Sequence, residues 1–295
     1  MQPTSDNETN PMIRSLFFAP ANRPELAVKF ARFQADCSVI DLEDGTPDAE
    51  KTRARGMLRE TVDAVRAAGL RSMLAVRVNV PDSPHYMADI EAAFACDIDA
   101  IVIPKLERPE QTFALSQWFK DRTSHDRKCT LIGGIESVRG VLDAVDICDR
   151  TPYLSAVYFG AEDFAADIGG RRTKQGAEVA AARSWVVMAA RAARLTAIDI
   201  AVLDIRDDTL FAQDASFGRD LGYQGKICVA PAQVRLAHRA FSPTDEERVY
   251  AQRLVDTYEA ATARGIGTID FEGRMVDGPL LKHSLAVLAT PHEDA

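Results

Sequence analysis

Short apolar runs alternate with longer amphipathic runs along most of the chain. The apolar runs are rich in Val, Ile, Leu and Phe and are bounded by polar or turn-forming residues, which indicates strands that are buried on both faces. Eight strands are expected, at residues 15–20, 37–44, 72–79, 100–105, 129–136, 154–163, 196–203 and 225–230. Each is followed by a helical pattern, at residues 23–34, 48–68, 83–95, 108–121, 137–149, 177–194, 207–221 and 231–241.

This alternation predicts the fold class. Eight strand–helix units within about 225 residues favour a closed (β/α)8 TIM barrel over an open doubly wound sheet. The glycine fingerprint GxGxxG of a dinucleotide-binding sheet does not follow the first strand. We therefore expect an α/β protein built on a parallel barrel.

Three segments are expected along the chain. Residues 1–12 are polar and contain two prolines, which is typical of a disordered arm. Residues 13–241 form the predicted barrel. Residues 242–295 exceed the eight-unit count and read as a polar helix, a hairpin-like segment and a final helix, so they are interpreted as a C-terminal helical extension.

The composition is that of a globular protein with a substantial core, because 46% of the residues are hydrophobic and 27% are charged. The net charge of -9 argues against a nucleic-acid surface or a polybasic membrane patch. No secretory pattern or apolar run of ~20 residues is visible. The five cysteines lack CxxC spacing and are expected to be reduced thiols. These features predict a cytoplasmic protein without nucleic-acid or membrane partners.

Polar residues gather where the predicted strands end. In a barrel of this kind the active site lies at the C-terminal ends of the strands. The residues expected there are Asp41, Glu43, Asp44, Arg77, Asn79, Lys105, Glu136, Glu162, Asp163 and Asp204. Carboxylates crowded together repel one another unless a cation, a proton or a basic group lies among them.

Glu136 and Asp163 are the last residues of neighbouring predicted strands, so their side chains are expected to lie close together. Two carboxylates with open positions suit Mg²⁺, with Mn²⁺ as the alternative ion. The chain contains no HxH or HExxH motif, which argues against zinc. The other interpretation is that these acids cap the following helices or pair with Arg77 and Lys105.

Nine sequence segments together carry a family resemblance. RSLFFAPANRPE, DLEDGTPDAEKTRAR, RVN, PKLERPE, GGIES, FGAEDFAADIG and QGKICVAPAQV occur in this order, followed by FEGRMVDGPLL and KHSLAVL. They resemble the citrate lyase β-subunit-like (CitE-like) branch of the HpcH/HpaI aldolase superfamily, whose members include malyl-CoA, methylmalyl-CoA and citramalyl-CoA lyases. The resemblance extends over roughly residues 13–290.

The resemblance implies roles for residues at the barrel mouth. In the family, the residues equivalent to Glu136 and Asp163 bind Mg²⁺. Arg77 is implied to grip the carboxylate or keto oxygen of an oxo-acid, a role for which its planar guanidinium is well suited. Glu43 and Asp44 are implied to assist catalysis by orienting waters and Arg77.

The resemblance also implies a coenzyme A site. Phe18 and Arg23, on and after the first strand, are expected to contact the CoA moiety, with Lys51 as a secondary phosphate ligand. Read from the residues alone, Lys51 is equally suited to a solvated helix face. The chain departs from the family at Ala21, where Gly is usual, and at Val229, where the family has an IHP segment, so no catalytic histidine is expected there.

The segment MVDGPLL resembles the family's MIDxP segment. Its Asp277 is implied to reach a neighbouring subunit's site as an acid/base, which predicts a homotrimer or hexamer in which the extension packs on a neighbouring subunit. From the residues alone, Asp277 precedes a Gly-Pro helix start and is equally suited to cap that helix.

The implied activity is that of a Mg-dependent carbon–carbon lyase. It would cleave or form a 3-hydroxyacyl-CoA, such as malyl-CoA, methylmalyl-CoA or citramalyl-CoA, with an oxo-acid and an acyl-CoA as the small-molecule partners. The alternatives are a thioesterase, a CoA-independent class II aldolase of 4-hydroxy-2-oxo acids, a citrate lyase β subunit acting on an acyl-carrier thioester, and a non-catalytic barrel partner protein. The presence of Glu136 and Asp163 argues against the last.

Overall fold

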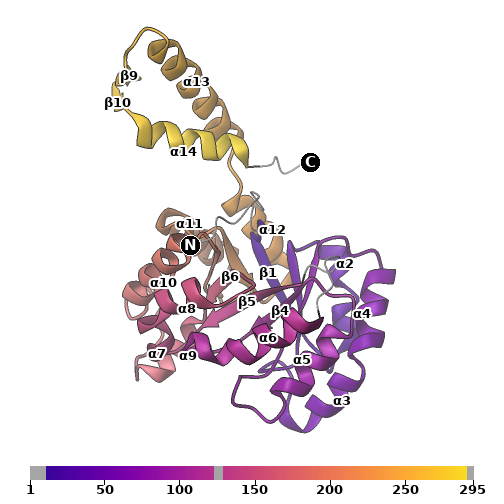
Figure 1. The fold of residues 1–295 in the computed structure, drawn as a ribbon. Helices are drawn as coiled ribbons and strands as arrows, with labels where there is room; N and C mark the ends of the chain where they lie inside the picture. The colour runs from indigo at the N-terminus through magenta and orange to yellow at the C-terminus, as the bar shows by residue number, and fades with distance from the viewer. Residues whose placement is uncertain (1–10, 123–128, 291–295) are drawn as a thin grey trace. The chain divides into compact units, whose positions relative to one another are not determined.

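Most of the chain folds into a closed parallel barrel of eight strands and the helices that follow them (Figure 1). The computed structural model describes residues 11–122 and 129–290. The strands follow one another around the barrel in chain order, and β1 pairs with β8 to close it. They are β1 Ser15–Pro20, β2 Cys37–Asp41, β3 Met73–Arg77, β4 Ala100–Ile103, β5 Thr130–Ile135, β6 Leu154–Phe159, β7 Thr196–Asp199 and β8 Gly225–Cys228. The predicted (β/α)8 TIM barrel is confirmed.

Helices surround this barrel. The α-helices are α1 Pro24–Ala27, α2 Phe30–Phe33, α3 Lys51–Gly56, α4 Leu58–Ala67, α5 Tyr86–Phe94, α6 Phe113–Arg122, α7 Val138–Leu142, α8 Ala144–Arg150, α9 Ala161–Asp167, α10 Ala180–Ala192, α11 Asp208–Leu221 and α12 Pro231–Phe241. Short 3₁₀ helices occupy Asp48–Glu50 and Pro109–Thr112. Three helices predicted as continuous are divided, at residues 23–34, 48–68 and 137–149. The longest breaks after Gly56, a residue with low helix propensity.

The end of β6 differs from the sequence prediction. The strand stops at Phe159, four residues before the predicted end, and α9 begins at Ala161. Glu162 and Asp163 therefore lie in the first turn of α9 and not at the strand end. Carboxylates are favourable in a first turn because they face the positive end of the helix dipole.

Alternate residues of the strands point into the barrel, where Ala75 and Ala156 belong to a buried apolar cluster. Two positions further along β3 and β6, the inward positions are occupied by Arg77 and Tyr158. The barrel interior is thus apolar below and becomes polar at the C-terminal ends of β3 and β6.

A buried ionic network lies between the barrel and two of its helices. Asp199 of β7 accepts hydrogen bonds from Arg183 of α10 at 2.8 Å and from Lys226 of β8 at 3.0 Å. Arg183 also donates to Asp214 of α11 at 3.0 Å. The charges are mutually paired, as fully buried charges require. This network fastens α10 and α11 to the outer face of β7 and β8.

The chain divides into two compact units, the first running to Ala237 and the second from His238. The second unit contains α13 Asp245–Thr262, an antiparallel hairpin of β9 Ile269–Phe271 and β10 Arg274–Val276, and α14 Gly278–Ala289. Leu254, Phe271 and Val276 form its small core. The predicted hairpin and final helix of the extension are confirmed.

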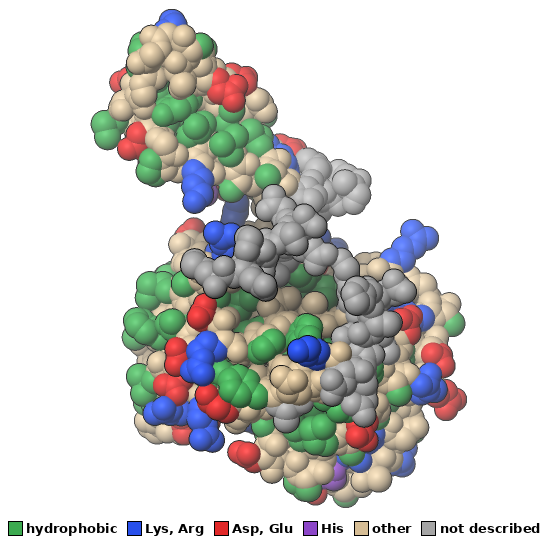
Figure 2. All heavy atoms as spheres, viewed as in Figure 1, with side chains coloured by type: hydrophobic (Ala, Val, Ile, Leu, Met, Phe, Trp, Pro, Cys, Tyr) green, Lys and Arg blue, Asp and Glu red, His purple; other side chains and the backbone are tan. Residues whose placement is uncertain are grey.

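The surface carries charges of both signs. On the face seen in Figure 2, acidic and basic side chains of the first unit are interspersed, with no single broad basic area. Across the residues that the structure describes, no helix has the length and apolar character needed to span a bilayer.

Candidate active site

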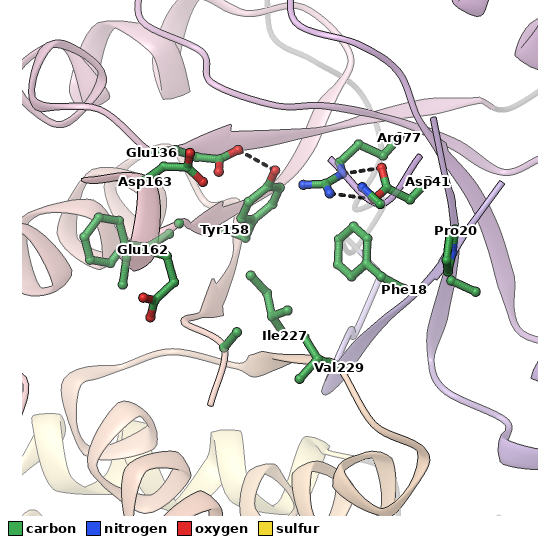
Figure 3. Close-up of a pocket in the computed structure, with 16 residues that line it drawn as sticks. Phe18, Pro20, Asp41, Arg77, Glu136, Tyr158, Glu162, Asp163, Ile227 and Val229 are labelled. Atoms are coloured by element: carbon green, nitrogen blue, oxygen red, sulfur yellow. Dashed lines mark hydrogen bonds and ion pairs between the residues drawn. The ribbon is translucent and has the colours of Figure 1, made fainter. Parts of the chain in front are cut away.

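A pocket of about 280 Å³ lies at the C-terminal ends of the barrel strands (Figure 3). Its polar wall comes from β2, β3, β5, β6 and α9, and its apolar wall from β1 and β8. The polar wall includes Asp41, Arg77, Glu136, Tyr158 and Asp163, and the apolar wall includes Phe18, Pro20, Ile227 and Val229. The pocket is therefore suited to a ligand with one charged end and one apolar end.

Arg77 is held in a fixed orientation at the end of β3. Its Nε and Nη2 atoms each donate to a different carboxylate oxygen of Asp41, both at 2.7 Å, and its Nη1 lies 3.2 Å from Oε2 of Glu43. The Phe18 ring centroid lies 5.0 Å from the guanidinium carbon. Burial opposes the charge, but Asp41 outweighs it and raises the pKa of Arg77 well above its usual range. Arg77 is thus a charged group that is oriented before a ligand binds.

Asp41 also organises the loop that follows β2. Its two carboxylate oxygens accept hydrogen bonds from the backbone N–H groups of Glu43 at 2.9 Å and Gly45 at 2.8 Å. These bonds wind the segment DLEDG around one buried carboxylate. Asp41 therefore connects the position of Glu43 to the orientation of Arg77.

Glu136, directly after β5, is 3% exposed. Its Oε1 accepts hydrogen bonds from the Tyr158 hydroxyl at 2.6 Å and from the backbone N–H of Lys105 at 3.1 Å. Its Oε2 has no hydrogen-bond donor among the described residues. Burial raises the pKa of Glu136 to about 7, and the neighbouring charge of Asp163 adds to this effect, while Tyr158 and Arg77 oppose it. Glu136 is thus a buried carboxylate that forms no ion pair with a basic side chain among the described residues.

Lys105 lies among three other carboxylates. Its ammonium nitrogen is 2.8 Å from Oε1 of Glu43, 3.2 Å from Oδ2 of Asp44 and 3.4 Å from Oδ1 of Asp163. Burial opposes its charge, but these acids outweigh burial and raise the pKa of Lys105. Its backbone adopts a φ of 53°, which is uncommon for residues other than glycine. The interpretation in which the acids pair with basic groups therefore holds for Glu43 and Asp44, and in part for Asp163.

Two carboxylates of the pocket are suited to a divalent cation. Glu136 and Asp163 line the same wall, and both are hard oxygen donors of the kind that Mg²⁺ prefers. In the described part of the chain, no group of three or more His, Cys, Asp or Glu side chains is arranged to hold a metal. The pair would thus supply two ligands and leave the other positions to water and substrate oxygens. The unpartnered Oε2 of Glu136 fits this arrangement.

Other residues singled out in the sequence lie outside the pocket lining. Arg23 pairs with Glu25 on the exposed surface. Lys51 donates to Oδ1 of Asn79, whose amide in turn donates to the backbone oxygen of Leu42 at 3.0 Å. Lys51 thus helps to join the loops after β2 and β3.

Asp277 belongs to the second unit and stands at the N-cap position of α14. Its side chain makes no capping hydrogen bond. The capping role that the sequence allows is therefore not realised, and the carboxylate remains available for another function.

Sequence reasoning did not select Tyr158, although it directly precedes the segment FGAEDFAADIG, which carries Asp163. One feature of the sequence points to it. Tyr158 lies two positions after Ala156, so both side chains lie on the same side of the strand, and Ala156 faces the barrel interior. Asp167 has a different role, since its Oδ2 accepts a hydrogen bond from the backbone N–H of Val138 at the start of α7, at 2.7 Å.

Comparisons with known proteins identify the family of the chain. Residues 14–231 match the family described as HpcH/HpaI aldolase/citrate lyase. A citrate lyase subunit beta-like protein of Deinococcus radiodurans is 39% identical over 280 residues, which cover 94% of this chain and 97% of that protein. The mitochondrial citramalyl-CoA lyase of Homo sapiens is 30% identical over 288 residues, covering 92% and 83%.

A solved structure of CitE from Mycobacterium tuberculosis, in complex with magnesium, acetoacetate and coenzyme A, is also similar. It superposes with a TM-score of 0.75 at 29% identity, covering 95% of this chain and 97% of that one. A second CitE structure, with magnesium and pyruvate, gives a TM-score of 0.71 at 26% identity, covering 95% and 100%.

Proposed function

The chain belongs to the HpcH/HpaI aldolase/citrate lyase family and is therefore a carbon–carbon lyase, and on this premise we propose that it cleaves a 3-hydroxyacyl-CoA into an oxo-acid and an acyl-CoA. The same site would run the reaction in the direction of condensation. The single observation that carries this proposal is the pocket in which a pre-oriented Arg77 faces the carboxylates of Glu136 and Asp163. The bound molecules of the similar CitE structure, magnesium, acetoacetate and coenzyme A, support it.

Glu136 and Asp163 are the proposed holders of Mg²⁺, with Mn²⁺ as a substitute. When bound, the ion would supply positive charge that lowers the cost of negative charge on substrate oxygens. The chain itself contributes a buried setting in which such a charge is poorly screened by water, because Glu136 is almost fully buried.

Arg77 is the proposed binder of the oxo-acid carboxylate. Asp41 engages two of the five N–H donors that a guanidinium carries, so others remain for a ligand. Because Asp41 and Phe18 already fix the guanidinium, little side-chain freedom is lost when the carboxylate binds. The apolar wall formed by Ile227 and Val229 then faces the acyl portion of the substrate.

The proposed reaction moves two protons. A base takes the proton of the substrate hydroxyl, and a carbonyl forms as the bond to the thioester α-carbon breaks. The electron pair of that bond passes to the α-carbon as an enolate, which then takes up a proton. We assign this second proton to Asp277 of a neighbouring subunit in a homotrimer or hexamer, where the 242–295 extension would pack. Its uncapped carboxylate supports that role.

A substrate screen tests the proposal. Purified protein with Mg²⁺ is incubated separately with malyl-CoA, methylmalyl-CoA, citramalyl-CoA and a CoA-free 4-hydroxy-2-oxo acid, and the oxo-acid and acyl-CoA products are measured. We expect turnover of at least one CoA ester, lost on addition of EDTA and in the Glu136→Gln variant. Turnover of the CoA-free compound alone would establish an aldolase instead. Free CoA released without an oxo-acid would indicate a thioesterase.

A further inference from the structure

The carboxylate of Glu136 is hydrogen-bonded unevenly. Both of its hydrogen bonds, from Tyr158 and from the backbone of Lys105, end on Oε1. In Figure 3 the Tyr158 hydroxyl points at this oxygen from the side of the pocket where Arg77 lies. A carboxylate held by one oxygen presents the other in a defined direction.

Tyr158 is itself firmly held. It is 2% exposed, and its ring belongs to the apolar cluster inside the barrel together with Ile132 and Ile198. Within the described part of the chain, its hydroxyl has one hydrogen-bond partner, which is Glu136. Burying a hydroxyl is unfavourable unless it is hydrogen-bonded, so the position of this hydroxyl is tied to that of the carboxylate.

Two glycine residues, Gly134 and Gly160, lie close to the carboxylate of Glu136. A Cβ atom at Gly134 would overlap both Oε1 of Glu136 and the Tyr158 hydroxyl. A Cβ atom at Gly160 would lie 2.5 Å from Oε2 of Glu136. The carboxylate therefore lies against the backbone of β5 and of the turn after β6, in space that a side chain at either glycine would occupy.

We propose that Tyr158 is a positioning residue, which fixes Oε1 of Glu136 by its hydrogen bond and thereby turns Oε2 toward the divalent cation. The inference rests on the proposed function, because it assumes that Glu136 binds the ion. It assigns no contact between Tyr158 and the substrate. Residues that orient a metal ligand in this way commonly contribute 10–100-fold to metal affinity.

Mn²⁺ binding to the full-length protein tests this role without relying on activity. The dissociation constant for Mn²⁺ is measured by titration calorimetry, and free Mn²⁺ is followed by electron paramagnetic resonance. The variants are Tyr158→Phe, which removes only the hydroxyl, and Tyr158→Met, whose flexible side chain fills similar space. The second variant keeps the test informative if the first does not fold.

Tyr223→Phe is the matched control. Tyr223 is 3% exposed, and its hydroxyl donates to the backbone oxygen of Arg183 at 2.7 Å, outside the pocket lining. We expect Tyr158→Phe to weaken Mn²⁺ binding by about 10–100-fold. Tyr223→Phe should lower thermal stability by a similar amount to Tyr158→Phe and leave the dissociation constant for Mn²⁺ within about twofold of the unsubstituted protein.

The outcomes separate the two proposals. If the unsubstituted protein binds Mn²⁺ and Tyr158→Phe binds it equally well, the positioning role is wrong and the magnesium site stands. If the folded, unsubstituted protein does not bind Mn²⁺ at all, the magnesium part of the proposed function fails, and the positioning role fails with it. Weak binding that is specific to the Tyr158 variants supports both.

Discussion

The ammonium nitrogen of Lys105 lies 3.4 Å from Oδ1 of Asp163, a carboxylate that we propose as a magnesium ligand. The same ammonium is 2.8 Å from the buried Glu43. One protein cation therefore pairs with acids from two segments, the loop after β2 and the first turn of α9. A divalent ion at Asp163 would approach this fixed positive charge, so the two cations oppose each other electrostatically.

Substituting Lys105→Met should have opposite effects on metal binding and on metal-free stability. Removing the ammonium lowers repulsion at the ion site, and we expect Mn²⁺ to bind about tenfold more tightly. Glu43 then loses its closest partner, so the free energy of unfolding in EDTA should fall by about 3 kcal/mol. Titration calorimetry and urea unfolding measure the two quantities.

Lys120→Met, at an exposed position of α6, is the control for removal of one positive charge and should change neither quantity measurably. Weaker Mn²⁺ binding by Lys105→Met would show that Lys105 supports the ion site instead of opposing it.

The pKa of Glu136 predicts a pH-dependent stability term. Since the pKa is raised from 4.5 to about 7 in the metal-free protein, the folded state holds more protons than the unfolded state between these pH values. The stability that the neutral carboxyl group contributes is present below pH 4.5 and is lost as the pH rises through about 7. The loss amounts to about 3 kcal/mol.

Glu136→Gln stays neutral at every pH, so it isolates this term. The measured quantity is the free energy of unfolding of the variant minus that of the unsubstituted protein, both in EDTA. This difference should increase by about 3 kcal/mol when the pH is raised from 5 to 8. Saturating Mg²⁺ should cancel much of the difference, because the ion stabilises the ionised carboxylate. A difference between the two proteins that does not change with pH would contradict the raised pKa.

Gly134 is predicted to be required both for full stability and for metal binding. Gly134→Ala introduces a methyl group that overlaps both Glu136 and Tyr158, so the carboxylate or the ring must move. We expect a loss of about 1–3 kcal/mol in the free energy of unfolding, together with weaker Mn²⁺ binding. Thermal unfolding and Mn²⁺ titration on the same samples check both effects.

Gly56→Ala gives the matched control, because nothing lies within 4 Å of a Cβ atom at this helical position. This substitution should stabilise the protein by about 0.5–1 kcal/mol and leave metal affinity unchanged. If Gly134→Ala behaves in the same way, a methyl group at this position does not displace Glu136 or Tyr158.

Mixing two inactive variants tests the role proposed for Asp277. Asp277→Asn and Glu136→Gln should each abolish lyase activity when assayed alone. If Asp277 acts on a neighbouring subunit, random subunit exchange at equal amounts should restore about a quarter of the activity of the unsubstituted protein, because one site in four then draws intact residues from two different chains.

Each variant subjected to exchange with itself provides the baseline for that measurement. Activity that stays at this baseline, while the mixed oligomers are shown to form, would place Asp277 in the site of its own chain or outside the reaction.

The sequence pattern was most informative where the physical signal is local and strong. The apolar run at Ser15–Pro20 predicted β1 to the residue, and the other seven strands were located with their C-terminal ends set too late. The late ends have two causes, because polar residues such as Asp44 and Asp163 are counted with the strands that precede them, and after β7 the apolar run continues through Leu203 although the strand ends at Asp199. The TIM barrel followed from the number and order of the units, which local errors of this kind do not alter.

The contacts within the site were less predictable. The sequence indicates Arg77, Glu136 and Asp163 from their places at or near the C-terminal ends of predicted strands, and they line one pocket. The partners of these residues depend on side-chain direction and on distant segments. The position of Lys105 among the acids follows from a backbone conformation with positive φ, which a lysine in a sequence does not signal. Strand parity would have placed Tyr158 inside the barrel.

The pairing of β1 with β8 determines when the pocket comes into being. Phe18 and Val229 both belong to the apolar wall of the pocket, yet Phe18 lies on the first strand of the barrel and Val229 directly follows the last. A chain emerging from a ribosome therefore lacks half of the apolar wall until nearly the whole barrel has been synthesised, and such long-range closure is slow compared with local helix formation. Ligand binding therefore requires the closed barrel. A truncated chain that ends before β8 lacks the complete apolar wall and cannot bind substrate against it.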